Sequence, residues 1–205
     1  MPTEKATTPP LCQLKITLIG TDPPIWRRIQ VPSTIRLCCL HDALQAVMGW
    51  TDSHLHQFER NGKYWGVREN DEFGDLDITD ESRVPLEKVL RVEGDSVVYV
   101  YDLGDDWRHE VLLEKILPPD ATANRPVCIG GERHCPPEDV GGVSGYQEFL
   151  EVIFEPNNED FNHLVGWAGG PFQAEEFDLN AVNEILSRMR WPIRHRHQSS
   201  ARTKS

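Results

Sequence analysis

Side chains that could bind a metal ion or transfer a proton are concentrated in two segments of the sequence. The first segment contains Asp102, Asp105, Asp106, Trp107 and His109. The second segment, residues 128–142, contains Cys128, His134, Cys135, Glu138 and Asp139. Carboxylates, imidazoles and thiolates bind divalent metals, and carboxylates and imidazoles also exchange protons near neutral pH. We therefore expect a polar site where the second segment folds against the first.

A divalent metal ion, zinc in particular, is one hypothesis for this site. Its possible ligands are Cys128, Cys135, His109 and His134. Six residues separate the two cysteines, whereas zinc sites typically space them by about two to four, and no second cysteine pair follows. In the alternative, the thiols are packed in the core and the acids cap turns. The sequence leaves both interpretations open.

Two further histidines, His54 and His56, lie two residues apart on a predicted strand and so face the same side of it. They could supply two metal ligands. Since no third ligand is visible beside them, a pair of surface or rim histidines is the simpler interpretation.

The elements that must position these residues begin with a predicted hairpin of residues 11–19 and 25–31. Apolar residues recur at every second position in both segments. From Leu40 the period changes to that of a helix, and Gly49 follows where a left-handed cap would end it. A second hairpin is predicted around Asn61-Gly62, because this dipeptide favours a two-residue type I′ turn.

The acidic residues 68–83 show no periodicity and predict a solvated loop. A short helix at 85–90 and strands at 97–101 and 111–117 are expected next, with Trp107 buried between the two strands. Beyond Pro118 the pattern predicts helices and no strand. The three predicted helices are 144–154, 159–167 and 179–190, the last beginning at an Asp178 N-cap.

Together these elements predict an α+β fold. We expect a rolled, mainly antiparallel sheet with a β-grasp-like start, in which a hairpin, a helix and further hairpins are covered by C-terminal helices. The chain has 205 residues, 39% of them hydrophobic, which suits one domain with its own core. The predicted organisation is a disordered tail at 1–10, one domain at 11–192 and a basic flexible tail at 193–205.

The formal charge of -12 is unevenly distributed along the chain. Six basic residues and no acids lie in residues 188–205, and removing those six positive charges lowers the charge from -12 to -18. An acidic body repels phosphate backbones, so nucleic acid is not an expected partner of the domain, although the basic tail could contact it. No apolar run approaches the roughly 20 residues that span a bilayer, and no signal peptide is visible, so we expect a cytoplasmic protein without membrane contact.

Several blocks of the sequence resemble the signature blocks of the plasmid pRiA4b ORF-3-like family. They are Pro24-Ile25-Trp26-Arg27-Arg28, Met48-Gly49-Trp50, residues 101–110 (YDLGDDWRHE), residues 135–142 (CPPEDVGG), Gly145-Tyr146 and Glu176-Phe177-Asp178. The blocks occur in the expected order over about residues 11–190. The resemblance implies an α+β roll and no established activity. A transposon-resolvase label is sometimes attached to the family, but the acidic body offers no serine within an arginine cluster and no basic DNA-binding module.

Three classes of function follow from these observations. The first is a non-catalytic binding or interaction module, with a protein or small-molecule ligand in a polar groove between residues 102–109 and 128–142. The second is a metal-dependent hydrolase in which His109, Asp106 and Cys135 hold a metal ion and Glu138 activates water. The third and weakest is a DNA-associated protein.

Overall fold

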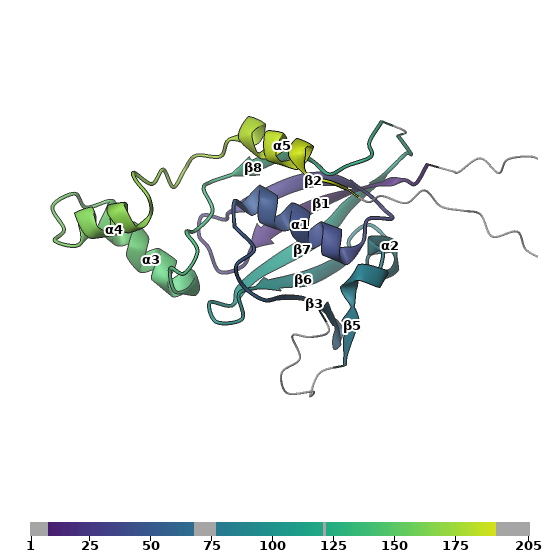
Figure 1. The fold of residues 1–205 in the computed structure, drawn as a ribbon, viewed down its shortest axis with the longest axis horizontal. Coiled ribbons are helices and arrows are strands. Elements are labelled where there is room, and N and C mark those ends of the chain that lie inside the picture. Colours follow the sequence, from purple (N-terminus) through teal and green to yellow (C-terminus); the bar gives the residue numbers. More distant parts are fainter. Residues whose placement is uncertain (1–7, 68–76, 121, 192–205) are drawn as a thin grey trace, which may run out of the picture.

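The computed structural model describes residues 8–67, 77–120 and 122–191 and contains one eight-stranded sheet (Figure 1). The strands are β1 (Leu11–Leu18), β2 (Trp26–Pro32), β3 (His56–Arg60), β4 (Lys63–Gly66), β5 (Ile78–Asp80), β6 (Ser96–Tyr101), β7 (Trp107–Leu117) and β8 (Val127–Glu132). Their order across the sheet is β5-β4-β3-β6-β7-β1-β2-β8. All neighbours are antiparallel except β4 and β5, which are parallel.

Helices supply the remaining regular structure of the described residues. They are α1 (Leu37–Met48), the 3-10 helix η2 (Glu81–Arg83), α2 (Leu86–Val89), α3 (Gly142–Ile153), α4 (Phe161–Trp167) and α5 (Leu179–Arg188). α1 lies across one face of the sheet, and α5 lies beside it over β8 (Figure 1). α3 and α4 pack on each other beyond one end of the sheet. The protein is therefore α+β with a mainly antiparallel sheet, as predicted, and the sheet is not closed.

The first hairpin and helix form as the periodicity predicts. Alternate residues of β1 and β2 are buried, and α1 buries ten of its twelve residues beneath this face. The helix ends at Gly49, whose φ of 86° is left-handed and whose N–H donates to the Gln45 carbonyl. Trp50 then folds back into the core.

The Asn61-Gly62 hairpin between β3 and β4 is also confirmed. Asn61 and Gly62 have φ values of 51° and 73°, and Arg60 pairs directly with Lys63 across the turn. These positive values are those that a type I′ turn requires. The turn chemistry alone was enough to locate this hairpin.

The expectation of a loop over residues 68–83 is wrong in its second half, and residues 68–76 lie outside the described residues. Ile78–Asp80 forms β5 beside β4, and the Asp80 carboxylate then caps η2 by accepting from Ser82 N–H. A three-residue strand has too few positions to show a period of two. Only its pairing with β4 reveals it.

The expectation of no strand beyond Pro118 is also wrong. β8 pairs antiparallel with β2 and forms one edge of the sheet. Its sequence lacks alternation because it contains Gly130 and Gly131. A Cβ at Gly131 would lie 2.7 Å from Phe177 and 2.9 Å from Arg27, so the close packing of this edge requires glycine. The three helices after β8 form as predicted, and Asp178 caps the last by accepting from two backbone N–H groups.

None of the helices in the described part of the chain is long and apolar enough to cross a membrane.

Arg27 is a buried cation that joins three elements of the fold. The side chain extends from β2 into the core and is 2% exposed. Its Nε donates to the Val47 carbonyl in the last turn of α1, and its Nη1 donates to the carbonyls of Trp26 and Glu132, each at 2.8 Å. The guanidinium also lies 4.1 Å from the centre of the Phe177 ring. Burial lowers the pKa of Arg27 below its usual value.

No acidic residue of the described part of the chain forms an ion pair with Arg27. Carbonyl oxygens, an aromatic face and the negative end of the α1 dipole therefore compensate its charge. A buried charge of this kind is tolerated only when such partners are in place. The contacts of Arg27 thus fix the end of α1 against β2 and β8.

We expect Arg27→Lys to lower the free energy of unfolding by about 2 to 4 kcal/mol. Each hydrogen bond to a charged group contributes about 1.5 to 3 kcal/mol, and a lysine ammonium cannot reproduce the planar, forked hydrogen bonds of the guanidinium. Arg28→Lys is the control. Arg28 is partly exposed and pairs with Glu114. We therefore expect Arg28→Lys to lower the free energy of unfolding by no more than about 1 kcal/mol. Equal losses for both variants in urea titrations would contradict the assigned role of Arg27.

We expect Trp107→Ala to lower the free energy of unfolding by about 3 to 5 kcal/mol, the range for large aromatic residues removed from a core. Trp107 is 1% exposed and packs beside Trp50. The matched control is Trp167→Ala, because Trp167 is 45% exposed, and its loss is expected to be about 1 kcal/mol. Denaturant titrations compare the two variants. A smaller loss of stability for Trp107→Ala than for Trp167→Ala would show that Trp107 is not part of the core.

Candidate functional site

Three segments meet at one end of the sheet. They are the connection from α1 to β3 (residues 49–55), the turn from β6 to β7 (residues 102–106) and the loop after β8 (residues 133–141). Trp50 Nε1 donates to the Pro136 carbonyl at 3.0 Å, and the Gly141 N–H donates to Asp105 Oδ2 at 3.1 Å. The loop and the turn are therefore in direct contact, as predicted.

Gly142 shows how closely the loop approaches the turn. Its φ of 68° is left-handed, and a Cβ at this position would lie 2.5 Å from the Asp105 carbonyl oxygen. Any other residue would have to displace the backbone of the turn. The glycine pair at 141 and 142 thus serves this contact and begins α3.

The polar side chains along this contact form what we call the polar rim. Its members are Thr51, Ser53, His54, Asp102, Glu138 and Asp139. Each of the three segments contributes at least one of them. The rim thus contains three of the seven binding residues predicted from sequence, namely Asp102, Glu138 and Asp139.

Glu138 is held by hydrogen bonds to both of its carboxylate oxygens. Tyr101 Oη donates to Oε1 at 2.6 Å, while Thr51 donates to Oε2 through its hydroxyl at 2.5 Å and its N–H at 3.2 Å. Burial and the hydrogen bond to Glu138 raise the pKa of Tyr101. With both oxygens engaged, Glu138 orients the loop, and this arrangement does not suit a base that activates water.

His54 lies between two aspartates of the rim. Its Nε2 is 3.0 Å from Asp139 Oδ1 and 3.6 Å from Asp102 Oδ2. Both aspartates have left-handed backbone conformations, with φ of 53° at Asp102 and 60° at Asp139. The sequence identified the two aspartates but not their contact with His54, because His54 and Asp102 lie 48 positions apart in the chain and their approach depends on the pairing of β3 with β6.

The other predicted site residues have different surroundings. Asp105 bonds the loop through Gly141, and Asp106 is exposed and pairs with Arg108 at 3.4 Å. Trp107 and His109 lie in the core below the rim. His109 packs edge-on against Trp50, and its Nδ1 lies 3.3 Å from the Tyr99 carbonyl.

The four residues predicted to bind zinc do not form a compact ligand group. Two groups of three metal-binding side chains have ligand atoms within 4.8 Å of one another in the described residues. They are His41, Asp52 and His56, and His54, Asp102 and Asp139. Neither group includes Cys128, Cys135, His109 or His134. Burial in the core also raises the pKa of the Cys135 thiol to about 12.

His41 and His56 form a buried stack, so the interpretation of His56 as a surface or rim residue is wrong. The ring centres are 3.5 Å apart and the planes differ by 4°. His41 contacts Tyr99 Oη at 2.8 Å and Asp52 Oδ1 at 2.9 Å, and His56 contacts Glu81 at 3.0 Å. Burial, aided by His56, lowers the pKa of His41 to about 4. These ring nitrogens already have partners, which indicates a structural network.

A hollow of about 450 Å³ begins at Asp139 and extends between α3 and α4. We call it the acidic hollow. Its lining residues are Asp139, Val140, Gly145, Glu148, Phe149, Val152, Asp160, His163, Leu164 and Trp167. Three of them are acids and none is lysine or arginine. An apolar floor with an acidic border suits a ligand that is both apolar and positively charged.

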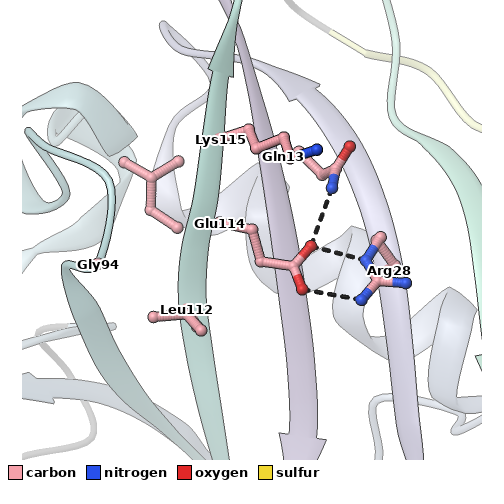
Figure 2. A pocket seen from close by; sticks show the side chains of 7 residues that line it. Gln13, Arg28, Gly94, Leu112, Glu114 and Lys115 are labelled. Carbon is pink, nitrogen blue, oxygen red and sulfur yellow. Dashed lines mark hydrogen bonds and ion pairs between the residues drawn. The ribbon is translucent and has the colours of Figure 1, made fainter.

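A second hollow, of about 540 Å³, lies on the sheet over β1, β2 and β7 (Figure 2). Arg28 donates to both oxygens of Glu114, at 2.6 and 2.8 Å, and Gln13 donates to the same carboxylate at 2.9 Å. The hydrogen bond from Arg28 lowers the pKa of Glu114 to about 2. Because Arg28 and Glu114 satisfy each other, this hollow is less suited to a charged ligand.

Comparison with known proteins agrees with the sequence blocks and the fold. Residues 10–181 match the family described as "Plasmid pRiA4b ORF-3-like protein". The chain belongs to this family. It is 41% identical over 172 residues to the "Uncharacterized protein y4hQ" of Sinorhizobium fredii, covering 83% of this chain and 85% of that protein.

A solved member of the fold is the crystal structure of the protein of unknown function MM3350 from Methanosarcina mazei Go1. The two chains superpose with a TM-score of 0.78 at 39% identity, over 86% of this chain and 98% of MM3350. The pRiA4b ORF-3-like assignment thus explains the α+β fold. Neither relative carries a name that states an activity, so function has to be argued from the site.

We expect the protein to lose stability as the pH falls from about 6.5 to about 4, in part because of His109. Burial lowers the pKa of this fully buried imidazole to about 4, whereas an unfolded histidine has a pKa of about 6.5. The unfolded chain therefore binds the proton first, and acid favours unfolding. Urea titrations at several pH values should show a shallower decline for His109→Gln than for the parent chain. An unchanged decline would contradict this role of His109.

Proposed function

We propose that this protein is a non-catalytic binding module that recognises a basic, partly apolar segment of a partner protein. The binding surface consists of the polar rim, between the 102–109 hairpin and the 128–142 loop, and the acidic hollow that begins at Asp139. The observation that carries the proposal is the lining of the hollow. It combines aromatic and aliphatic side chains with three acids, and it contains no basic side chain other than His163.

The hollow can provide two kinds of contact to an arginine or lysine side chain. Asp139, Glu148 and Asp160 can pair with its charge. Trp167, which is 45% exposed, offers an aromatic face on which a guanidinium can stack. The net charge of -12 would also attract a basic partner over a distance.

The floor of the hollow supports a partner with apolar residues next to its basic ones. Phe149 is buried beneath the surface, and Trp167 packs edge-on against it at 6.1 Å between ring centres. Val152 and Leu164 complete the apolar part. Aromatic anchors in such pockets contribute much of the binding energy at protein interfaces.

The hydrolase alternative receives less support from the positions of its residues. His109 is fully buried under Trp50, Cys135 has a pKa raised to about 12 by burial, and Glu138 is engaged at both oxygens. A metal-activated water needs an accessible ion and a base within reach of it. The proposed module uses the surface above these residues and needs none of them to react.

A fluorescein-labelled amphipathic peptide with alternating arginine and leucine residues tests the proposal by fluorescence anisotropy. We expect saturable binding that weakens with salt, and a loss of at least about tenfold for Glu148→Lys and for Asp160→Lys, since each reverses a charge in the hollow. Glu151→Lys is the matched control, because Glu151 is an exposed acid of α3 outside the hollow lining.

An equal loss for Glu151→Lys would show that only net charge matters, and the proposed surface would be wrong. Absence of peptide binding to the parent chain at physiological salt would overturn it as well. A peptide in which glutamate replaces arginine should not bind.

A further inference from the structure

We propose that His54, Asp102 and Asp139 bind one divalent transition-metal ion, of the manganese and zinc class. We call these residues the rim triad. They come from the three segments that meet at the rim, so an ion here would join the α1–β3 connection, the β6–β7 turn and the loop after β8. The site differs from the Cys128, Cys135, His109 and His134 set expected from sequence.

The spacing of the three side chains suits one ion. His54 Nε2 is 3.0 Å from Asp139 Oδ1 and 3.6 Å from Asp102 Oδ2, and all three ligand atoms lie within 4.8 Å of one another. Metal–ligand bonds of about 2.0 to 2.2 Å place neighbouring ligands of one ion roughly 3 to 3.5 Å apart. Small side-chain adjustments would therefore complete the coordination.

His54 Nε2 is a ring nitrogen whose hydrogen-bonding capacity is unused. The atom is shielded from solvent and makes no hydrogen bond, although it faces two carboxylate oxygens. A shielded ring nitrogen that makes no hydrogen bond is unfavourable. A cation bonded to this nitrogen and to both carboxylates would satisfy all three groups.

Asp102 is oriented toward this position by its own turn. Its Oδ1 accepts from the N–H groups of Gly104 at 3.0 Å and Asp105 at 3.3 Å, which directs Oδ2 to His54. The side chain is 11% exposed, and neither Asp102 nor Asp139 pairs with a lysine or arginine among the described residues. Hydrogen bonds that fix a ligand in this way are characteristic of metal sites.

The group of His41, Asp52 and His56 serves as an internal comparison. Both nitrogens of His41 contact protein groups, His56 contacts Glu81, and the two rings are stacked. Both ring nitrogens of His41 and Nε2 of His56 are already used, so we assign no ion there. The rim triad differs because its nitrogen lacks a hydrogen bond.

The ligand types define the class of ion. One imidazole nitrogen and two carboxylate oxygens suit Mn²⁺, Fe²⁺ and Zn²⁺, whereas Mg²⁺ and Ca²⁺ prefer oxygen ligands alone. Three protein ligands also leave coordination positions for water or for a group of a bound partner. Asp139 borders the acidic hollow, so an ion here would lie next to the proposed binding surface.

Mn²⁺ binding to the full-length, EDTA-treated protein tests the proposal, with Mn²⁺ preferred because it avoids the five cysteine thiols. Calorimetry should show one Mn²⁺ per chain, and pulsed EPR should show coupling to a histidine nitrogen. We expect His54→Gln to abolish the nitrogen coupling, and Asp102→Asn and Asp139→Asn to weaken binding at least about tenfold. Mg²⁺ should compete poorly.

Asp106→Asn is the matched control for Asp102→Asn. Asp106 lies in the same turn, also has a left-handed φ, of 52°, and loses the same charge on substitution. Asparagine tolerates this conformation and keeps an oxygen for the turn hydrogen bonds, so thermal melts should show that each variant folds. Asp52→Asn tests whether the ion binds instead at the group of His41, Asp52 and His56.

Three results would overturn the proposal. They are the absence of Mn²⁺ binding to the parent chain, equal weakening by Asp106→Asn, and loss of the ion in Asp52→Asn with retention in Asp102→Asn. The proposal does not depend on the peptide-binding function. Asp102 lies outside the lining of the acidic hollow, so peptide binding and Mn²⁺ binding can fail separately.

Discussion

A guanidinium removed from water requires hydrogen-bond acceptors on several sides, and Arg27 finds them in three parts of the chain. Its bonds to the carbonyls of Val47, Trp26 and Glu132 connect the end of α1, β2 and the end of β8. Trp50, just beyond the end of α1, in turn bonds Pro136 in the loop after β8. The position of the polar rim thus depends on a charge buried beneath it.

The rim is built from turns whose backbone conformations leave little freedom. Asp102 and Asp139 are left-handed, and Gly142 approaches the Asp105 carbonyl more closely than a side chain allows. Such conformations persist when surrounding contacts hold them. Here the hydrogen bonds of Glu138 to Thr51 and Tyr101 hold the loop. A pre-organised polar surface of this kind loses little conformational entropy on binding a ligand, which is consistent with a binding module.

The sequence located part of the candidate site and missed the rest for identifiable reasons. Asp102, Glu138 and Asp139 could be found because acids cluster near prolines and glycines in two turn-rich segments. His54 could not be assigned to them, because several strands and helices separate it from both partners along the chain. Cys128 and Cys135 suggested a metal site by residue type alone, whereas their burial makes them part of the core.

By itself, the sequence determined the structures that local interactions control. The alternation of β1 and β2, the apolar stripe of α1 ending at Gly49, the Asn61-Gly62 turn and the Asp178 cap all depend on neighbours within a few residues. Only the tertiary structure decided the pairing of β5 and β8, the burial of Arg27 and the meeting of His54 with Asp102 and Asp139. These features depend on contacts between distant segments, and such contacts leave no period or turn signal in the sequence.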